Sequence, residues 1–170
     1  QVRFEVTSKS LAPQLGIVAP LREWELVTRE MEVDYAVARG IAIPITRAKP
    51  YSIDQNIWGC AIECGEMEEL WAEPPADAWL MTRDPSHAAK GSVELVLSFE
   101  QGIPVAIDGR PMGGVELITF VNNLAGTFGV RRIDMVENRI VGLKSREVYE
   151  APAATLIHMA HTELERITLD

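Results

Sequence analysis

The sequence has few of the residues on which metal centres and disulfide frameworks depend. Its 170 residues include two cysteines and three histidines. Cys60 and Cys64 do not have the two-residue spacing of a redox motif, and no second cysteine pair exists to complete a zinc site. We therefore expect two free thiols. His158 and His161 lie on a predicted helix, where we interpret them as surface residues and expect no metal site.

Long apolar runs are absent as well. None approaches the roughly 20 residues that span a bilayer, and none has the pattern of a secretory signal peptide. Free thiols suit a reducing compartment, so the sequence predicts a cytoplasmic protein without a membrane partner. Hydrophobic residues make up 47% of the chain, which is enough for the core of one domain or of parts of two.

Basic residues are scarce relative to acidic ones. The chain carries 16 Lys and Arg against 25 Asp and Glu, so its formal net charge is −9 and its pI is about 4.9. A nucleic-acid backbone would be repelled on average, and we expect no nucleic-acid partner. An acidic surface still allows small charged ligands that are held in a local pocket.

The first part of the chain alternates predicted strands with a helix. Residues 15–19 form a short apolar strand, and residues 41–45 form another that Pro44 interrupts, which favours a sheet edge. Between them, Thr28 can cap a helix that stops at Gly40. The apolar residues on one face of that helix are Val27, Met31, Tyr35 and Ala38. This order of elements is typical of an α/β layer.

The chain from residue 49 onwards predicts an α+β arrangement. Residues 49–85 look irregular, because proline and glycine punctuate them. Residues 93–99 and 103–107 alternate apolar and polar side chains, so we expect a hairpin that turns at Glu100-Gln101-Gly102. Two helices follow it along the chain.

The first of these helices covers about residues 115–125, and the second runs from about residue 152 to 166, where Pro152 suits a first helical turn. The inward side chains of the first helix are Leu117, Val121 and Leu124.

The stretch GVRRIDMVENRIVGLKSREVYEAP, residues 129–152, combines apolar residues with charges of both signs. Residues 133–136 and 140–143 predict two short strands. The polar residues expected where these strands run into loops are Asp134, Glu137, Asn138 and Arg139. So many charges near apolar positions need mutual pairing or a charged ligand. From the residues alone, a salt-bridged surface hairpin and a ligand site are about equally good interpretations.

RIDMVENR followed by GLKSREVYEAP resembles the signature of the argininosuccinate synthases. Two further segments of that family occur in the same order, QVRFE at the start and KPYSIDQNIWG at residues 49–59. The resemblance covers the whole chain, and three ordered motifs of this length are a strong signal. It implies the reaction that joins citrulline to aspartate with ATP, through an adenylated citrulline, releasing pyrophosphate and AMP.

The resemblance also implies a fold and partners. Residues 1–48 would be the C-terminal end of a nucleotide-binding domain of the adenine nucleotide alpha hydrolase-like (PP-loop) class. Residues 49–170 would be the first part of the synthetase domain, with its hairpin and helices. Alternation over residues 2–7 predicts a strand, but the resemblance favours a helix, and we follow the resemblance. Citrulline, aspartate and ATP with Mg would be the substrates of a homotetramer.

The residues that match citrulline-binding positions of the family are Arg3, Ser52, Glu137 and Tyr149. Glu137 would accept a charge-assisted hydrogen bond from the α-ammonium, and the Tyr149 hydroxyl can donate or accept. In a purely structural role, the possible salt-bridge partners of Glu137 are Arg132, Arg139 and Arg146. Tyr149 could equally be a half-buried core residue, Ser52 a turn residue, and Arg3 a surface partner of Glu5 or Asp34.

Two positions depart from the family pattern. Ala61 stands where many members have a serine that contacts citrulline, so one hydrogen bond is missing or replaced by water. Arg131 stands where glycine is usual, so a positive φ there would be costly.

The family's Ser-Gly-Gly-Leu-Asp-Thr loop for ATP is not among these residues, and Met112-Gly113-Gly114 does not substitute for it. The Asn-Asp pair that would precede QVRFE and bind aspartate is missing too. Both ends look cut, so we expect an inactive fragment without a catalytic residue, with ATP bound mainly by the absent N-terminal part. Two alternatives stay open: a non-catalytic paralogue that binds citrulline-like amino acids, and a structural or interaction module without a ligand.

Overall fold

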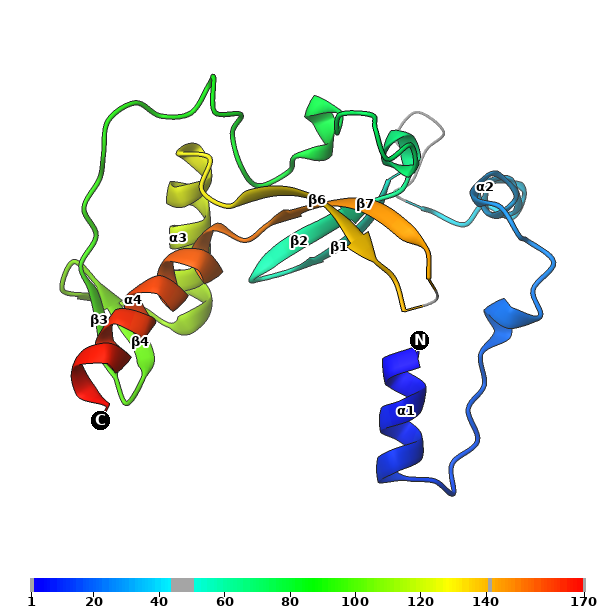
Figure 1. The fold of residues 1–170 in the computed structure, drawn as a ribbon, viewed down its shortest axis with the longest axis horizontal. Helices are drawn as coiled ribbons and strands as arrows, with labels where there is room; N and C mark the ends of the chain where they lie inside the picture. The colour runs from blue at the N-terminus through cyan, green and yellow to red at the C-terminus, as the bar shows by residue number, and fades with distance from the viewer. Residues whose placement is uncertain (1, 44–50, 141, 170) are drawn as a thin grey trace. The chain divides into compact units, whose positions relative to one another are not determined.

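The computed structural model describes residues 2–43, 51–140 and 142–169. The chain divides into two compact units, Gln1–Ala48 and Lys49–Asp170 (Figure 1). The described elements of the first unit are α1 (Val2–Leu11), the short 3-10 helix η1 (Pro20–Arg22) and α2 (Arg29–Ala38). Helix α1 confirms the helix that the family resemblance favours over the alternating pattern. None of its described residues is buried, so the alternation does not mark a buried sheet face.

Helix α2 begins and ends where the sequence predicts. The backbone N–H of Met31 donates to Thr28 Oγ1 at 3.3 Å, which is an N-cap contact, and Gly40 adopts a positive φ of 65° after the last turn. The apolar face seen in the sequence is not the buried one, because the buried residues among those described in this helix are Val33 and Ala36. The ring of Trp24 contacts Tyr35 edge to face, with centroids 6.3 Å apart.

The first of the two strands expected in this unit was also wrong. Residues 15–19 form no strand, and Val18 is 86% exposed. A strand needs a neighbour for its backbone hydrogen bonds, and the described part of this unit contains none. Residues 41–43 likewise lie outside any strand; the remainder of that prediction, Pro44 and Ile45, falls outside the described residues.

The second unit contains a four-stranded antiparallel sheet of order β1-β2-β7-β6 (Figure 1). Its strands are β1 (Ser52–Asn56), β2 (Gly59–Glu63), β6 (Arg132–Asn138) and β7 (Lys144–Glu150). Strands β1 and β2 form a hairpin in the segment that the sequence predicts to be irregular. The pattern hides β1 because four of its five residues are exposed. Gly59 allows the close approach of β2 to β7, since a Cβ there would lie 2.3 Å from the carbonyl oxygen of Glu150.

Strand β6 confirms the first strand predicted in the charged stretch, but the second was misplaced. Strand β7 begins only at Lys144, and Ile140 and Leu143 lie in the connecting turn with exposures of 76% and 64%. Gly142 supplies the positive φ of 83° in this turn. Asp134, Glu137 and Asn138 therefore lie within β6 rather than in a loop. Val141 is outside the described residues.

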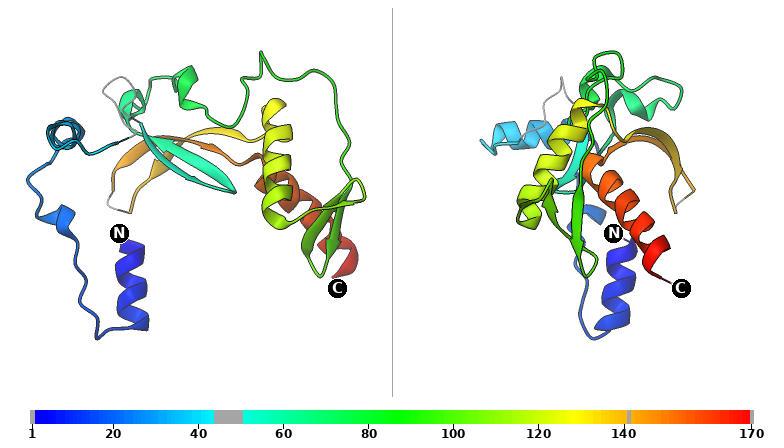
Figure 2. Two further views of the ribbon diagram at one scale, coloured as in Figure 1. Left: turned by 180° about the vertical axis from the view of Figure 1, so that it is seen from behind. Right: turned by 90° about the vertical axis from the view of Figure 1, so that its left-hand side faces the viewer.

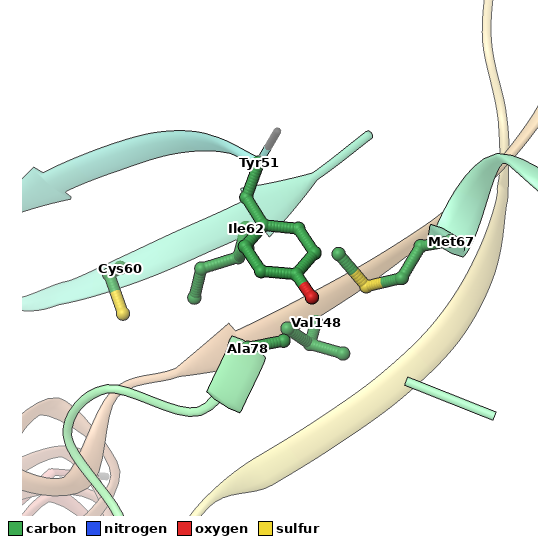
Figure 3. Close-up of a cluster of buried hydrophobic side chains, with 6 residues drawn as sticks. All are labelled: Tyr51, Cys60, Ile62, Met67, Ala78 and Val148. Atoms are coloured by element: carbon green, nitrogen blue, oxygen red, sulfur yellow. The ribbon is translucent and has the colours of Figure 1, made fainter. Parts of the chain in front are cut away.

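One face of this sheet packs on an apolar cluster (Figure 3). Its members are Tyr51, Cys60, Ile62, Met67, Ala78 and Val148. Met67 and Ala78 come from the short helices η2 (Gly65–Glu68) and η3 (Ala76–Ala78). Cys60 and Cys64 are free thiols, as the sequence predicts.

A second sheet and two helices complete the unit (Figure 2). The elements are β3 (Leu97–Glu100), β4 (Ile103–Ile107), β5 (Arg110–Pro111), α3 (Gly114–Thr127) and α4 (Pro152–Thr168). Both predicted helices are confirmed, as are the turn and the second strand of the predicted hairpin, whereas its first strand begins at Leu97 rather than at residue 93. Gln101 and Gly102 have φ values of 52° and 79°, as a type I′ turn requires. The core between these elements consists of Ile107, Leu117, Ile118, Val121, Ala153 and Ile157.

Asn122 of α3 links the β1–β2 turn of the four-stranded sheet to the start of α4. Its Nδ2 donates to the carbonyl oxygen of Ile57 at 2.8 Å, and its Oδ1 accepts from the backbone N–H of Ala153 at 2.9 Å. The start of α4 is thereby held beside the β1–β2 turn. Of the helices described, none has both the length and the apolar character needed to cross a membrane.

Candidate functional site

The antiparallel register sorts the side chains of the four-stranded sheet onto two faces. Ser52 pairs with Glu63, Ala61 with Tyr149, and Glu137 with Ser145, and successive residues of a strand point to opposite sides. We call the side that carries Ser52, Glu63, Glu137, Ser145, Glu147 and Tyr149 the front face. The back face carries the apolar cluster. Three of the four predicted site residues therefore share the front face.

The hydroxyl of Tyr149 lies between two carboxylates. Its oxygen is 2.7 Å from Glu137 Oε1 and 2.6 Å from Glu147 Oε2. Burial raises the pKa of the Tyr149 hydroxyl well above its ordinary value. The hydrogen bonds to both carboxylates and their negative charges raise it further. The hydroxyl therefore keeps its proton throughout the neutral range.

Glu147 is 8% exposed, and both of its carboxylate oxygens accept hydrogen bonds. Its Oε1 accepts from Ser145 Oγ at 2.7 Å and from Arg139 Nη2 at 2.9 Å. Arg139 also pairs with Glu63. Burial by itself raises the pKa of the Glu147 carboxyl. Hydrogen bonds from Tyr149 and Ser145 and the charge of Arg139 together outweigh that effect, so the pKa lies below its ordinary value.

Glu137 differs from Glu147 in having no arginine. The three candidate arginines pair elsewhere: Arg132 with Asp84 at 3.2 Å, Arg139 with Glu147 at 2.9 Å and Arg146 with Asp134 at 2.6 Å. No ion pair reaches Glu137 in the part of the chain that the structure describes, and its Oε1 lies 2.7 Å from the Tyr149 oxygen. The front face thus combines a buried, compensated carboxylate with a half-buried, uncompensated one.

A cleft of about 330 Å³ lies beside Tyr149. Its lining includes Asp54 and Ala61 on the front face and Ala154 from the first turn of α4. Ligand clefts for small molecules begin at roughly this size. Ala61 lies directly opposite Tyr149 in the strand pairing, so the family departure at this position removes a hydroxyl next to the Glu137–Tyr149 pair.

The other two predicted site residues are Ser52 and Arg3, which come from β1 and α1. Ser52 is half-buried on β1, at the edge of the sheet. Arg3 is exposed on α1 in the other unit.

Sequence reasoning missed Glu147 and Ser145, and it considered Arg139 as a partner of Glu137 rather than of Glu147. The signal was present, because Ser145, Glu147 and Tyr149 are spaced by two residues and must share one face if the segment is a strand. Placing the second strand at residues 140–143 hid this spacing. With the observed bounds of β7, the alternation alone assigns Glu147 to the same face as Tyr149.

Arg131, directly before β6, adopts a positive φ of 62°. This is the position at which the sequence departs from the usual glycine of the family, and the conformation is one that costs a non-glycine residue about 1–2 kcal/mol. The tight entry into β6 is therefore kept despite the substitution.

Metal ligands do not gather around this site. Over the described ranges, no three His, Cys, Asp or Glu side chains lie close enough to hold an ion. His161 pairs with Glu165 at 3.3 Å and contacts the ring of Phe99, with centroids 5.8 Å apart.

Two family models together cover nearly the whole chain. Residues 51–170 match the arginosuccinate synthase C-terminal domain, and residues 1–42 match the arginosuccinate synthase N-terminal HUP domain. The predicted fold class, the end of an adenine nucleotide alpha hydrolase-like domain followed by part of a synthetase domain, is thereby confirmed.

Curated relatives agree with these matches. Over all 170 residues the chain is 53% identical to an argininosuccinate synthase of Chlorobium luteolum, 55% identical to one of Chlorobium phaeobacteroides and 54% identical to one of Chlorobaculum parvum. The chain spans 42% of the length of each of these relatives.

Proposed function

The chain belongs to the argininosuccinate synthase family, and on that premise we propose that its front face binds citrulline in an ATP-dependent carbon–nitrogen ligase of arginine biosynthesis. The reaction condenses citrulline with aspartate to argininosuccinate and releases AMP and pyrophosphate. Most of the catalysis in such a reaction consists of holding polar reactants in line and stabilising charge. A site for the α-ammonium of citrulline is one part of that task.

The observation that carries the proposal is the state of Glu137. Its carboxylate lies 2.7 Å from the Tyr149 oxygen and has no arginine partner among the described residues. A half-buried carboxylate without a cation is costly unless a charged ligand completes it. An ammonium group supplies three donors and a compensating charge, so it suits a position beside the Glu137 carboxylate and the Tyr149 oxygen.

The other substrates and partners are proposals of the same kind. ATP with Mg would enter as a substrate held mainly by residues outside this chain, and aspartate would bind next to citrulline. Ser52 and Arg3 would contact citrulline from the sheet edge and from the nucleotide-binding domain. The complete enzyme would be a homotetramer.

Glu137→Gln tests the proposal in the full-length gene product. The variant keeps the shape of the side chain and removes its charge. We expect citrulline binding to weaken by about 1.5–3 kcal/mol, the range for a hydrogen bond to a charged group. The KM for citrulline, measured from pyrophosphate release, would rise roughly ten-fold to more than a hundred-fold, while the KM for ATP would scarcely change.

Asp134→Asn is the matched control for this experiment. Asp134 lies on the same strand but on the opposite face, where it pairs with Arg146 at 2.6 Å. The substitution should lower stability, because it weakens a bidentate pair with the largely buried Arg146, but it should leave the KM for citrulline unchanged. Equal losses for citrulline, aspartate and ATP in the Glu137 variant, with a lower melting temperature, would reject the ligand role.

A further inference from the structure

The hydroxyl of Tyr149 has one proton and two carboxylate neighbours. Its oxygen lies 2.6 Å from Glu147 Oε2 and 2.7 Å from Glu137 Oε1. A phenol donates a single hydrogen bond, so only one carboxylate receives the proton. The direction of that proton decides whether the hydroxyl presents a donor or a lone pair toward Glu137.

The surroundings of Glu147 fix this direction. Ser145 and Arg139 both donate to Glu147 Oε1, which leaves the Tyr149 hydroxyl as the donor to Oε2. The carboxylate is 8% exposed, and a buried carboxylate oxygen without a donor is costly. Glu137 is half-buried on the edge strand, where water can replace a missing donor. The Tyr149 proton therefore points to Glu147.

We propose, resting on the proposed function, that Glu147 is a positioning residue that makes the Tyr149 oxygen an acceptor for the α-ammonium of citrulline. With the phenol proton turned toward Glu147, the Tyr149 and Glu137 oxygens are two acceptors 2.7 Å apart with no proton between them, an arrangement that a cation beside both oxygens would stabilise. A primary ammonium can donate to both at once. The site therefore selects substrates that carry a free α-ammonium group.

Glu147→Gln reverses this arrangement without changing its shape. Ser145 and Arg139 are donors, so they hold the amide oxygen of the new glutamine. Its amide nitrogen then faces Tyr149 and donates to the phenol oxygen. The phenol proton turns to Glu137, which occupies the acceptor that the substrate ammonium needs.

The test compares citrulline with δ-ureidovalerate, which is citrulline without its α-amino group. In the full-length gene product, the dissociation constants of both compounds are measured by calorimetry, and their ratio gives the preference for the ammonium. We expect Glu147→Gln to reduce this preference about ten-fold. Glu147→Asp keeps the charge but draws it away from Tyr149, and should reduce the preference as well. The ratio does not depend on the fraction of folded protein.

Two further variants separate positioning from packing. In a Tyr149→Phe background, Glu147→Gln should change the preference no further, because Glu147 acts through Tyr149. Asp134→Asn removes a carboxylate on the opposite face of the sheet, which pairs with Arg146, and should keep the preference of the unmodified protein.

The outcomes distinguish this inference from the proposed function. Equal weakening of citrulline and δ-ureidovalerate binding by Glu147→Gln would make Glu147 a merely structural residue and overturn the inference alone. An unmodified protein that binds both compounds equally would contradict the ammonium site itself, and the inference would fall with it.

Discussion

Glu147 and Glu150 lie on the same strand, both nearly inaccessible to water, yet they belong to opposite faces of the sheet and have different surroundings. Glu150, on the back face, is 0% exposed, and Glu147, on the front face, is 8% exposed. The carboxylate of Glu150 accepts hydrogen bonds from buried and half-buried groups of the same unit. The hydrogen bonds of Glu147 continue through Tyr149 to a carboxylate that has no counter-ion among the described residues.

The donors around Glu150 form a closed set. The backbone N–H groups of Leu80 and Met81 donate to Oε2 at 2.7 and 3.0 Å, and the N–H of Thr82 donates to Oε1 at 2.8 Å. The Thr82 hydroxyl adds another bond. Burial, with the charge and hydrogen bond of Glu150, raises the pKa of the Cys60 thiol to about 12, so this thiol remains a protonated donor.

This difference separates a carboxylate that stabilises the fold from one that is available to a ligand. Every acceptor of Glu150 is used to hold residues 80–82 against the sheet, so it has no capacity left for a ligand. Glu137 receives a single contact and keeps free acceptors on a half-exposed face. Burial alone would place Glu147 and Glu150 ahead of Glu137 as site candidates, whereas the donors around each carboxylate favour Glu137.

The largest expected effect is the loss of stability on replacing Glu150 with Gln. One amide nitrogen would face backbone N–H groups that need an acceptor, and buried unsatisfied donors cost about 1–3 kcal/mol each. We expect the free energy of unfolding of the second unit to fall by about 3 kcal/mol or more. Urea denaturation of the 170-residue chain, followed by tryptophan fluorescence, measures it.

Glu137→Gln is the comparison for this variant. It should change the free energy of unfolding by less than about 1 kcal/mol, because the new amide can donate to the Tyr149 oxygen. A cost for Glu150→Gln no greater than that for Glu137→Gln would break the distinction between the two faces.

A smaller effect concerns the pH dependence of the Glu147 contacts. The folded pKa of Glu147 lies below its ordinary value of 4.5, so the ionised form stabilises the fold. This contribution is fully present above pH 4.5 and is lost as the pH falls through the folded pKa. The loss of stability in Glu147→Gln should therefore be about 1–2 kcal/mol at neutral pH and shrink on acidification. Urea titrations of both proteins at several pH values test this, and a difference that stays constant would contradict it.

The smallest effect is expected at Arg131, which shapes the backbone before β6 without lying on either face. Arg131→Gly should raise the free energy of unfolding by about 0.5–1 kcal/mol, because glycine adopts the φ of 62° without a steric cost. Gly129→Ala is the opposite control, since a Cβ there would lie 2.9 Å from the Arg83 carbonyl oxygen at a φ of 66°. Destabilisation by Arg131→Gly would show that the arginine side chain matters more than the backbone.

Local signals made several elements predictable. Thr28 and Gly40 frame α2, and Pro152 begins α4, because caps and helix-terminal prolines act within one turn of the chain. The hairpin at residues 100–102 follows from alternation and turn chemistry. The β1–β2 hairpin was not predictable in this way, and the apolar run at residues 15–19 wrongly predicted a strand, since short strands depend on partners that are distant in the sequence.

The sequence by itself determined the family, the acidic balance, both helices of the second unit and the choice of Ser52, Glu137 and Tyr149 as candidates. Only the tertiary structure decided which carboxylates are compensated. Glu150 accepts from residues about 70 positions earlier, and Arg139 pairs with Glu63, 76 positions away. Such contacts have no local signature, because the register of the folded sheet sets which side chains meet. For the same reason, the partnership of Tyr149 with Glu147 and Glu137 became visible only when β6 and β7 were paired.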